Sequence, residues 1–501
     1  MQHETGDARD KKQAAIKHRL GDLLHGDLLH DVGGLDSIAP FGYLSPTRMT
    51  SVAAAGGSLH RRIMHAPSSD LAGPPDVYGR GAPPPPPTQE LRGQRHAAVA
   101  VIGAGFTGLS TALHLAEAGI DVVVLEAKHI GWGASGRAFG QVVPYLKLGH
   151  AAILRHYGSE RGQRIVDAVA AGPDLVFELI GRHRIECWAI RSGLIFAAHS
   201  PGGRRELEAR TRYWQQRNAP VEMLEGARCA EFIGSSLYPS ASLDRRGGNI
   251  NPFAYARGLA HAAANAGATL YEKSPARSLA RRDGRWEIGA GAGQLIADSV
   301  VVATNAYTGD LWPGLRESII PMRGHGFVTE PLSDNVRHTI LPERQSLTDT
   351  RQLYSGVRML PDGRLHGSAH GPSFGAEPRA DWRRVDARIR ALFPQLGAVK
   401  WQQAWTGWVA MTTDHFPRLH ELAPGLYAGL GYNGRGIAAA TMMGRDLAAL
   451  AQGRRDDATV FPLTPLRPLG WHRIAPTLVR GLVQIYRVRD MLDDYRLSHA
   501  A

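Results

Sequence analysis

Three glycines with GxGxxG spacing give the clearest chemical signal in this 501-residue chain. Gly103 and Gly105 lie between a short apolar run at 97–102 and a helical pattern at 106–118, and Gly108 lies in the first turn of that pattern. In this context the first glycine permits a tight turn, the second lets the backbone approach a pyrophosphate, and the third allows close helix–strand packing. The N-terminus of the following helix offers free N–H groups to phosphate oxygens. The pattern therefore predicts a site for a dinucleotide.

An acidic residue follows at the spacing that such a site requires. Glu126 closes the apolar run DVVVLE at 121–126, 23 residues after Gly103 (126 − 103). Its carboxylate can accept hydrogen bonds from ribose hydroxyls and would repel a 2′-phosphate, which disfavours NADP. Strand, glycine turn, helix and second strand form a βαβ unit, the start of a doubly wound parallel sheet.

A second glycine-rich stretch favours a flavin. Residues 131–141 read GWGASGRAFGQ, small enough for the backbone to lie against a pyrophosphate, a ribityl chain and a flavin ring. Together with VIGAGFTGLSTALHLAEAG, this stretch resembles the D-amino-acid oxidase-like superfamily of FAD-dependent oxidoreductases, and within it the gamma-glutamylputrescine oxidase-like branch. The resemblance covers most of residues 97–495 and includes VVATNAYTGDLWP at 301–313 and GLGYNGRGIAAATMMGRDLA at 429–448.

The resemblance implies an α/β fold in which a doubly wound, Rossmann-like FAD-binding domain is interleaved with an α+β substrate domain built on an antiparallel sheet. The expected divisions are an FAD-binding domain at 96–185, 243–312 and 402–455, a substrate domain at 186–242 and 313–401, and a C-terminal helical tail at 456–501. Residues 1–95 contain a GDLLH repeat and five consecutive prolines. We expect this segment to be a disordered extension, or to precede the true start of the protein.

The resemblance also implies which residues bind FAD. They are Gly103, Gly105, Phe106, Thr107, Gly108, Glu126, Ala127, Ala134, Ser135, Gly136, Arg137, Gly140, Gln141, Ala276, Thr304, Asn433, Gly434, Arg435, Gly436 and Ile437. We expect the FAD to be non-covalent, because the stretch at 131–141 has no His and the stretch at 405–412 has no Cys.

The implied reaction is oxidation of a carbon–nitrogen bond in a small primary or secondary amine by hydride transfer to the flavin. Amino-acid oxidases of this superfamily typically carry an arginine for the substrate carboxylate in a GLRP-like block. The matching block at 407–410 has Val409 instead, which favours an amine; Arg358 could substitute or be structural. Phe139 stands where the branch usually has a small residue, and it could narrow the pocket.

Several aromatic and histidine side chains are candidates for the pocket wall. The catalytic candidates are Tyr354, His366 and Trp408, with Trp405 as a further wall residue that could equally be core. His325 and His366 could take up a proton near neutral pH.

Two other functions stay open. One is an amino-acid or N-methyl amino-acid dehydrogenase that passes electrons to quinone; the other is a non-catalytic flavin-binding module with its pocket blocked by Phe139. For the amine enzyme, oxygen or another acceptor would re-oxidise the flavin.

Composition limits the partners. The formal net charge is +12, but the arginines are scattered, so no nucleic acid is expected. Cys187 and Cys229 are the only cysteines and suggest neither a disulfide framework nor a metal site, which favours the cytoplasm.

Near the C-terminus, Leu478, Leu482 and Ile485 have helical spacing. We expect this helix to pack on its own domain, with an anionic membrane as the less favoured alternative.

Overall fold

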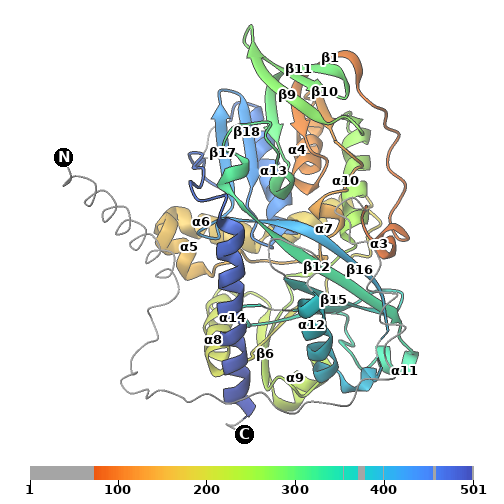
Figure 1. Ribbon diagram of the computed structural model, residues 1–501, viewed down its shortest axis with the longest axis vertical. Coiled ribbons are helices and arrows are strands. Elements are labelled where there is room, and N and C mark those ends of the chain that lie inside the picture. The colour runs from red at the N-terminus through yellow and green to blue at the C-terminus, as the bar shows by residue number, and fades with distance from the viewer. Residues whose placement is uncertain (1–72, 354, 371–378, 399, 455–457, 499–501) are drawn as a thin grey trace, which may run out of the picture. The chain divides into compact units, whose positions relative to one another are not determined.

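The GxGxxG segment folds as a strand, a turn and a helix at the centre of a parallel sheet. The strand β1 (Arg92–Ile102) pairs in parallel with β2 (Val122–Leu125) and β11 (Ala292–Val302). Along β1 the side chains alternate between two apolar clusters, because successive strand residues point to opposite faces. The computed structural model shown in Figure 1 describes residues 73–498 except 354, 371–378, 399 and 455–457.

This first sheet has eight strands. Its main order is β17-β18-β11-β1-β2-β8, and the antiparallel strands β10 and β9 extend it beside β11. The remaining bounds are β8 (Thr269–Tyr271), β9 (Ala276–Arg282), β10 (Arg285–Ala290), β17 (Arg418–Ala423) and β18 (Leu426–Leu430). The strands of this sheet come from distant parts of the sequence, as expected for an interleaved fold.

Helices with small, apolar faces cover the sheet. Buried residues of α4 (Phe106–Glu117), α10 (Pro252–Asn265) and α13 (Gly436–Ala451) share one apolar cluster with α7 (Gly172–Arg182). The helix α10 begins where the Asn251 side chain accepts hydrogen bonds from the N–H groups of Phe253 and Ala254, with Pro252 in the first turn. The helices α5 (His150–Tyr157) and α6 (Ser159–Ala170) precede α7.

The second sheet is mostly antiparallel and has the order β16-β12-β15-β14-β13-β4-β6-β5. Its bounds are β4 (Leu194–Ala197), β5 (Val221–Glu225), β6 (Ser240–Asp244), β12 (Ile320–Pro331), β13 (Ser346–Asp349), β14 (Gly356–Met359), β15 (Arg364–His370) and β16 (Trp401–Met411). Its helices include α8 (Pro201–Gln215), α9 (Gly226–Ile233), α11 (Asp334–Arg337) and α12 (Arg379–Leu392). The short pair β3 (Gln141–Val142) and β7 (Gly248–Asn249) forms a third sheet.

These two large sheets confirm the expected fold class, and they differ from the sequence analysis in two details. The strand β16 pairs with β12 in the second sheet, so residues 402–411 lie with the antiparallel sheet. The described part of the proline-rich segment, residues 73–95, is ordered and contains α3 (Asp76–Gly79). Arg257 and His261 of α10 hold its prolines through the carbonyls of Pro83 and Pro84. We therefore propose domain boundaries that differ from the expected ones in two ways. Residues 402–411 belong to the substrate domain, and residues 73–95 belong to the folded protein.

Candidate functional site

A cavity of about 700 Å³ lies between the glycine turns of the first sheet and the strands of the second. This is within the usual range for a cofactor or ligand site. Almost all residues implied to bind FAD line it. They are Gly103, Gly105, Phe106, Thr107, Glu126, Ala127, Ala134, Ser135, Arg137, Gly140, Gln141, Ala276, Thr304, Asn433, Gly434, Arg435, Gly436 and Ile437.

The two exceptions, Gly108 and Gly136, shape the cavity from behind. A Cβ at Gly108 would lie 1.9 Å from the carbonyl oxygen of Gly103, and one at Gly136 would lie 2.2 Å from that of Gly131. No side chain fits at either position, so both glycines are required for backbone packing. For Gly108 this is the helix–strand packing role that its place in GxGxxG predicts.

The phosphate end of the cavity is built by Gly105 and Ser135. The helix α4 begins directly after Gly105, and the backbone N–H of Phe106 donates to Ser135 Oγ at 3.0 Å. A Cβ at Gly105 would lie 2.9 Å from the same oxygen. Glycine at position 105 therefore leaves room for Ser135 beside the N-terminus of α4, and both residues line the cavity where an anionic pyrophosphate would be favoured.

Glu126 is held in place by the backbone. Its Oε2 accepts from the N–H of Ala104 at 2.9 Å and its Oε1 from the N–H of Lys128 at 2.8 Å. Burial raises the pKa of Glu126, and these two hydrogen bonds oppose the rise. Each carboxylate oxygen retains a second lone pair, so the side chain can also accept from a ribose hydroxyl.

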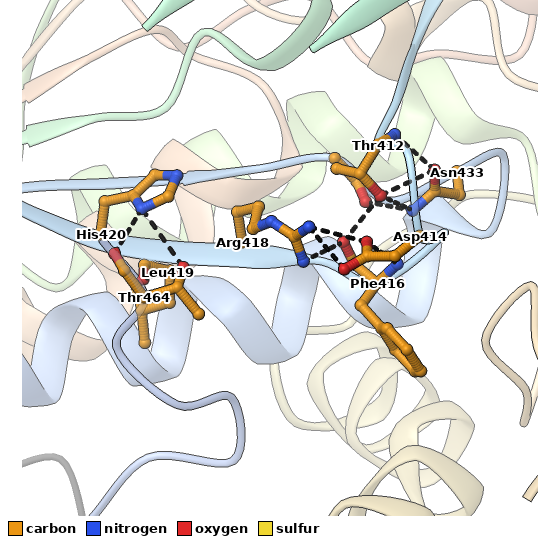
Figure 2. Close-up of polar contacts among 9 residues, drawn as sticks. Thr412, Asp414, Phe416, Arg418, Leu419, His420, Asn433 and Thr464 are labelled. Atoms are coloured by element: carbon orange, nitrogen blue, oxygen red, sulfur yellow. Dashed lines mark hydrogen bonds and ion pairs between the residues drawn. The ribbon is translucent and has the colours of Figure 1, made fainter. Parts of the chain in front are cut away.

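The late glycine turn is fixed by an asparagine with positive φ. Asn433 has φ 52°, a conformation that asparagine tolerates better than most residues. Its Oδ1 accepts from the N–H of Thr412 at 2.8 Å, and its Nδ2 donates to the carbonyl of Gly431 at 2.6 Å (Figure 2). Asn305 Oδ1 accepts from the N–H of Gly431 at 3.0 Å. These bonds place the N-terminus of α13 at the cavity, where its N–H groups can stabilise negative charge.

A salt bridge supports the loop between β16 and β17. Arg418 donates to both oxygens of Asp414 at 2.7 Å, and Thr412 Oγ1 donates to the carbonyl of Phe416 at 2.9 Å (Figure 2). The guanidinium holds the pKa of Asp414 below its usual value against the effect of burial. This loop carries Thr412 and thereby secures the turn at Asn433.

Aromatic residues that the sequence analysis missed complete the cofactor side. Tyr307 packs edge-on against Trp132, and its hydroxyl accepts from the N–H of Trp408 at 3.3 Å. The guanidinium of Arg137 lies 4.5 Å from the centre of the Trp132 ring. All four line the cavity. Tyr307 lies in the NAYT segment just after Thr304, a position that could have been found by extending that motif.

The second sheet supplies an uncharged wall. Its described lining residues are Gly324, His325 and Gly326 of β12, Thr348 of β13, His366, Ser368 and Ala369 of β15, and Gly407, Trp408 and Val409 of β16. Burial, assisted by Arg323, lowers the pKa of His325 to about 4. Burial, assisted by Arg358, lowers the pKa of His366 well below its usual value. Both imidazoles are therefore neutral at pH 7, and the expectation that they take up a proton near neutral pH is wrong.

His366 belongs to a buried cluster with Arg358 and Tyr78. Arg358 Nε donates to His366 Nδ1 at 3.3 Å, its Nη2 to the Tyr78 hydroxyl at 3.1 Å, and its Nη1 to the carbonyl of Ile250 at 2.8 Å. Because Nδ1 accepts, the proton of the neutral His366 ring is on Nε2. Tyr78 comes from the segment expected to be disordered, so sequence patterns gave no sign of its role.

Phe139 lines the cavity and packs against both Arg358 and His366 of this cluster. The Arg358 guanidinium lies 5.5 Å from the centre of the Phe139 ring, and the His366 ring lies 4.9 Å from it. Arg358 is 3% exposed and does not line the cavity, whereas Phe139 does. Within the described part of the chain, Arg358 forms no ion pair with an acid. It is thus a buried cation one aromatic ring away from the cavity.

Of the remaining candidates for the pocket wall, Trp408 lies at the cavity and Trp405 lies in the core. Trp408 lines the cavity, with the Arg323 guanidinium 4.7 Å from its ring centre. Trp405 is core: it is buried, and its Nε1 donates to the carbonyl of Arg137 at 3.0 Å. Tyr354 lies outside the described residues.

A Rossmann-like sheet with this glycine-lined cavity, joined to an antiparallel substrate-side sheet, defines a flavin-dependent oxidoreductase. The model of the DAO family, FAD dependent oxidoreductase, matches residues 98–450. The chain belongs to this family, and FAD is its cofactor.

Individual relatives agree with the family. The gamma-glutamylputrescine oxidoreductase of Escherichia coli (strain K12) is 33% identical over 79% of this chain and 93% of its own length. The probable oxidoreductase OrdL of Haemophilus influenzae is 30% identical over 82% of this chain and 94% of its own. The crystal structure of glycine oxidase from Geobacillus kaustophilus has a TM-score of 0.62 and 23% identity, and covers 75% of this chain and 99% of that one. This last likeness shows the fold.

Proposed function

We propose that the protein oxidises a carbon–nitrogen bond of a small primary or secondary amine that has no carboxylate next to the reacting carbon. The observation that carries this proposal is the uncharged substrate-side wall, in which both histidines are neutral and Val409 stands in the block where a carboxylate-binding arginine is expected. FAD, when bound, supplies the chemistry by accepting a hydride from the substrate.

The wall favours the form of the amine that can react. The described lining of the substrate-side wall contains no acidic residue and lies near the buried Arg358, so this wall disfavours an ammonium ion and favours the neutral amine. His366 presents a neutral ring at the wall, and its Nε2 has no hydrogen-bond partner among the described residues. The His366 ring is fully buried, so it shapes the wall from behind, while Trp408 and Phe139 line the cavity and exclude water.

The similarity to gamma-glutamylputrescine oxidoreductase supports an amine, whereas the name glycine oxidase shows that a relative acts on an amino acid. The test is anaerobic titration of the purified FAD protein with amines and with amino acids of the same carbon skeleton, followed by the oxidised-flavin absorbance. We expect an amine to bleach the oxidised-flavin absorbance of the unaltered protein. The variant His366→Ala should retain FAD, and the same amine should bleach its flavin more slowly. Bleaching with α-amino acids alone would reject the proposal.

Two further details belong to the proposal. Oxygen consumption during amine turnover would show that oxygen re-oxidises the flavin; turnover only with a quinone would show a dehydrogenase.

We also propose that FAD is bound non-covalently, since residues 131–141 contain neither His nor Cys. Acid precipitation should then release the flavin into the supernatant, and flavin that stays with the precipitate would contradict this.

A further inference from the structure

The C-terminal helix α14 (Ala475–Ser498) exposes a row of large apolar side chains. The row, here called the α14 stripe, has helical spacing and begins at the residue before the helix. Its members are Ile474, Leu478, Leu482, Ile485, Val488 and Leu492, and each is 38–56% exposed. The stripe runs from Ile474 to Leu492, 18 steps along the chain (492 − 474), or about 27 Å at 1.5 Å per residue.

The opposite face of α14 is the one that packs on the protein. Ala475 and Val483 are buried. Asp490 is also buried, and its carboxylate oxygens accept from the N–H groups of Gln352 and Leu353 at 3.1 and 3.2 Å. The helix therefore packs on its own domain, as expected, but through its inner face, while the row that includes Leu478, Leu482 and Ile485 stays exposed. Figure 1 shows α14 as the long dark-blue helix near the C-terminus.

Exposed apolar side chains of this size are concentrated here. Among the described residues, the other exposed large apolar side chains are Met491, also on α14, and Leu237, which precedes β6. Single exposed apolar residues are common on protein surfaces, but a contiguous row marks a contact surface.

The charges beside the stripe are basic. Arg473, Arg480 and Arg489 are exposed and Arg487 is half-exposed. Asp490 is the sole acid between Arg473 and Leu492, and it faces inward. Asp493 and Asp494 follow beyond the stripe in the sequence. The exposed face of this helix thus combines an apolar row with arginines on its flanks.

We propose that the α14 stripe binds an anionic lipid surface, with α14 lying parallel to the bilayer plane. An apolar face with flanking arginines has the composition of an interfacial helix, in which long basic side chains reach the lipid phosphates. Pairing of two copies through the stripe would bring the arginines of residues 473–492 together, and the one acid in that range, Asp490, faces inward. Among the described residues, no helix is long and apolar enough to cross a bilayer, so the contact is peripheral.

The test measures co-sedimentation of the FAD-loaded full chain with two kinds of vesicle. One contains phosphatidylcholine with phosphatidylglycerol, and the other contains phosphatidylcholine alone. The stripe variant carries Leu478→Ser, Ile485→Ser and Leu492→Ser. The matched control is Leu237→Ser, which removes one exposed apolar side chain far from α14 in sequence. Flavin absorbance and melting temperature verify that each variant is folded.

We expect binding to the anionic vesicles that weakens at high salt. Each serine substitution in the stripe should lower the partition coefficient about tenfold, and Arg480→Gln should lower it about fivefold. Leu237→Ser should bind like the unaltered protein. No binding to anionic vesicles, or equal binding by the stripe variant, would overturn the proposal. The proposal would also be overturned if the unaltered protein bound no vesicles but formed a dimer in solution, and the stripe variant were monomeric. That result would identify a second copy of the chain as the partner of the stripe.

Discussion

Removing the Phe139 ring should give the enzyme a binding site for a carboxylate. In Phe139→Ala the aromatic ring that stands between Arg358 and the cavity is lost. A substrate carboxylate could then accept hydrogen bonds from a buried guanidinium that has no acidic partner among the described residues. Hydrogen bonds to charged groups contribute about 1.5–3 kcal/mol. The ratio of kcat/KM for an amino acid to that for its matching amine should therefore rise about 10- to 150-fold.

The assay compares an amine with the amino acid of the same carbon skeleton, using flavin reduction as the readout. Phe139→Leu, which refills most of the space with an apolar side chain, is the matched control and should leave the ratio within a few-fold of its original value. In Phe139→Ala combined with Arg358→Met the gain should vanish, because the guanidinium is its source. An unchanged ratio in Phe139→Ala that keeps its FAD would refute the reasoning, and so would a gain that survives Arg358→Met.

Three further predictions follow from the site. Gly108→Ala places a Cβ 1.9 Å from a backbone oxygen, so FAD content should fall at least tenfold by absorbance; Gly181→Ala, which meets nothing within 4 Å, should retain it. Tyr78→Phe removes the acceptor of an Arg358 N–H and should lower the free energy of unfolding by about 2 kcal/mol in denaturant titrations; an unchanged value would exclude the buried bond. The pKa of His325 is lowered from 6.5 to about 4, so only the unfolded chain takes up this proton as the pH falls below about 6.5. The free energy of unfolding should decrease by up to about 3 kcal/mol between pH 6.5 and 4, and a flatter pH profile in His325→Gln would identify the source.

The cofactor side of the cavity was predictable because glycine is required where the backbone makes a tight turn or packs closely against another segment. At Gly103, Gly105 and Gly108 the residue type itself shows where the chain must turn or pack closely, so the motif locates the turn without tertiary information. The strand, helix and parallel pairing around it follow from the same segment. The late turn at Asn433 was found through the family resemblance.

The substrate side was less predictable because its properties arise from tertiary contacts. The neutrality of His366 depends on burial and on Arg358, which the sequence places eight residues away on another strand. Tyr78 sits in a segment whose prolines resemble a linker, yet contacts with α10 and β15 order it. The apolar row of α14 has the same spacing whether it faces inward or outward, so periodicity could not decide which.

The pairing of β1 with β11 has a consequence for biosynthesis. Arg92 aligns with Ala292, so the central strand of the cofactor sheet obtains its second neighbour only after about 200 more residues have been made. At roughly 5–20 residues per second, this leaves β1 with one open edge for about 10–40 s on the ribosome. The strands β17 and β18 arrive later still, and the turn at Asn433 follows them. The nascent chain therefore cannot complete its flavin cavity until most of it has been synthesised, and bound flavin becomes a reporter of chains whose folding is complete.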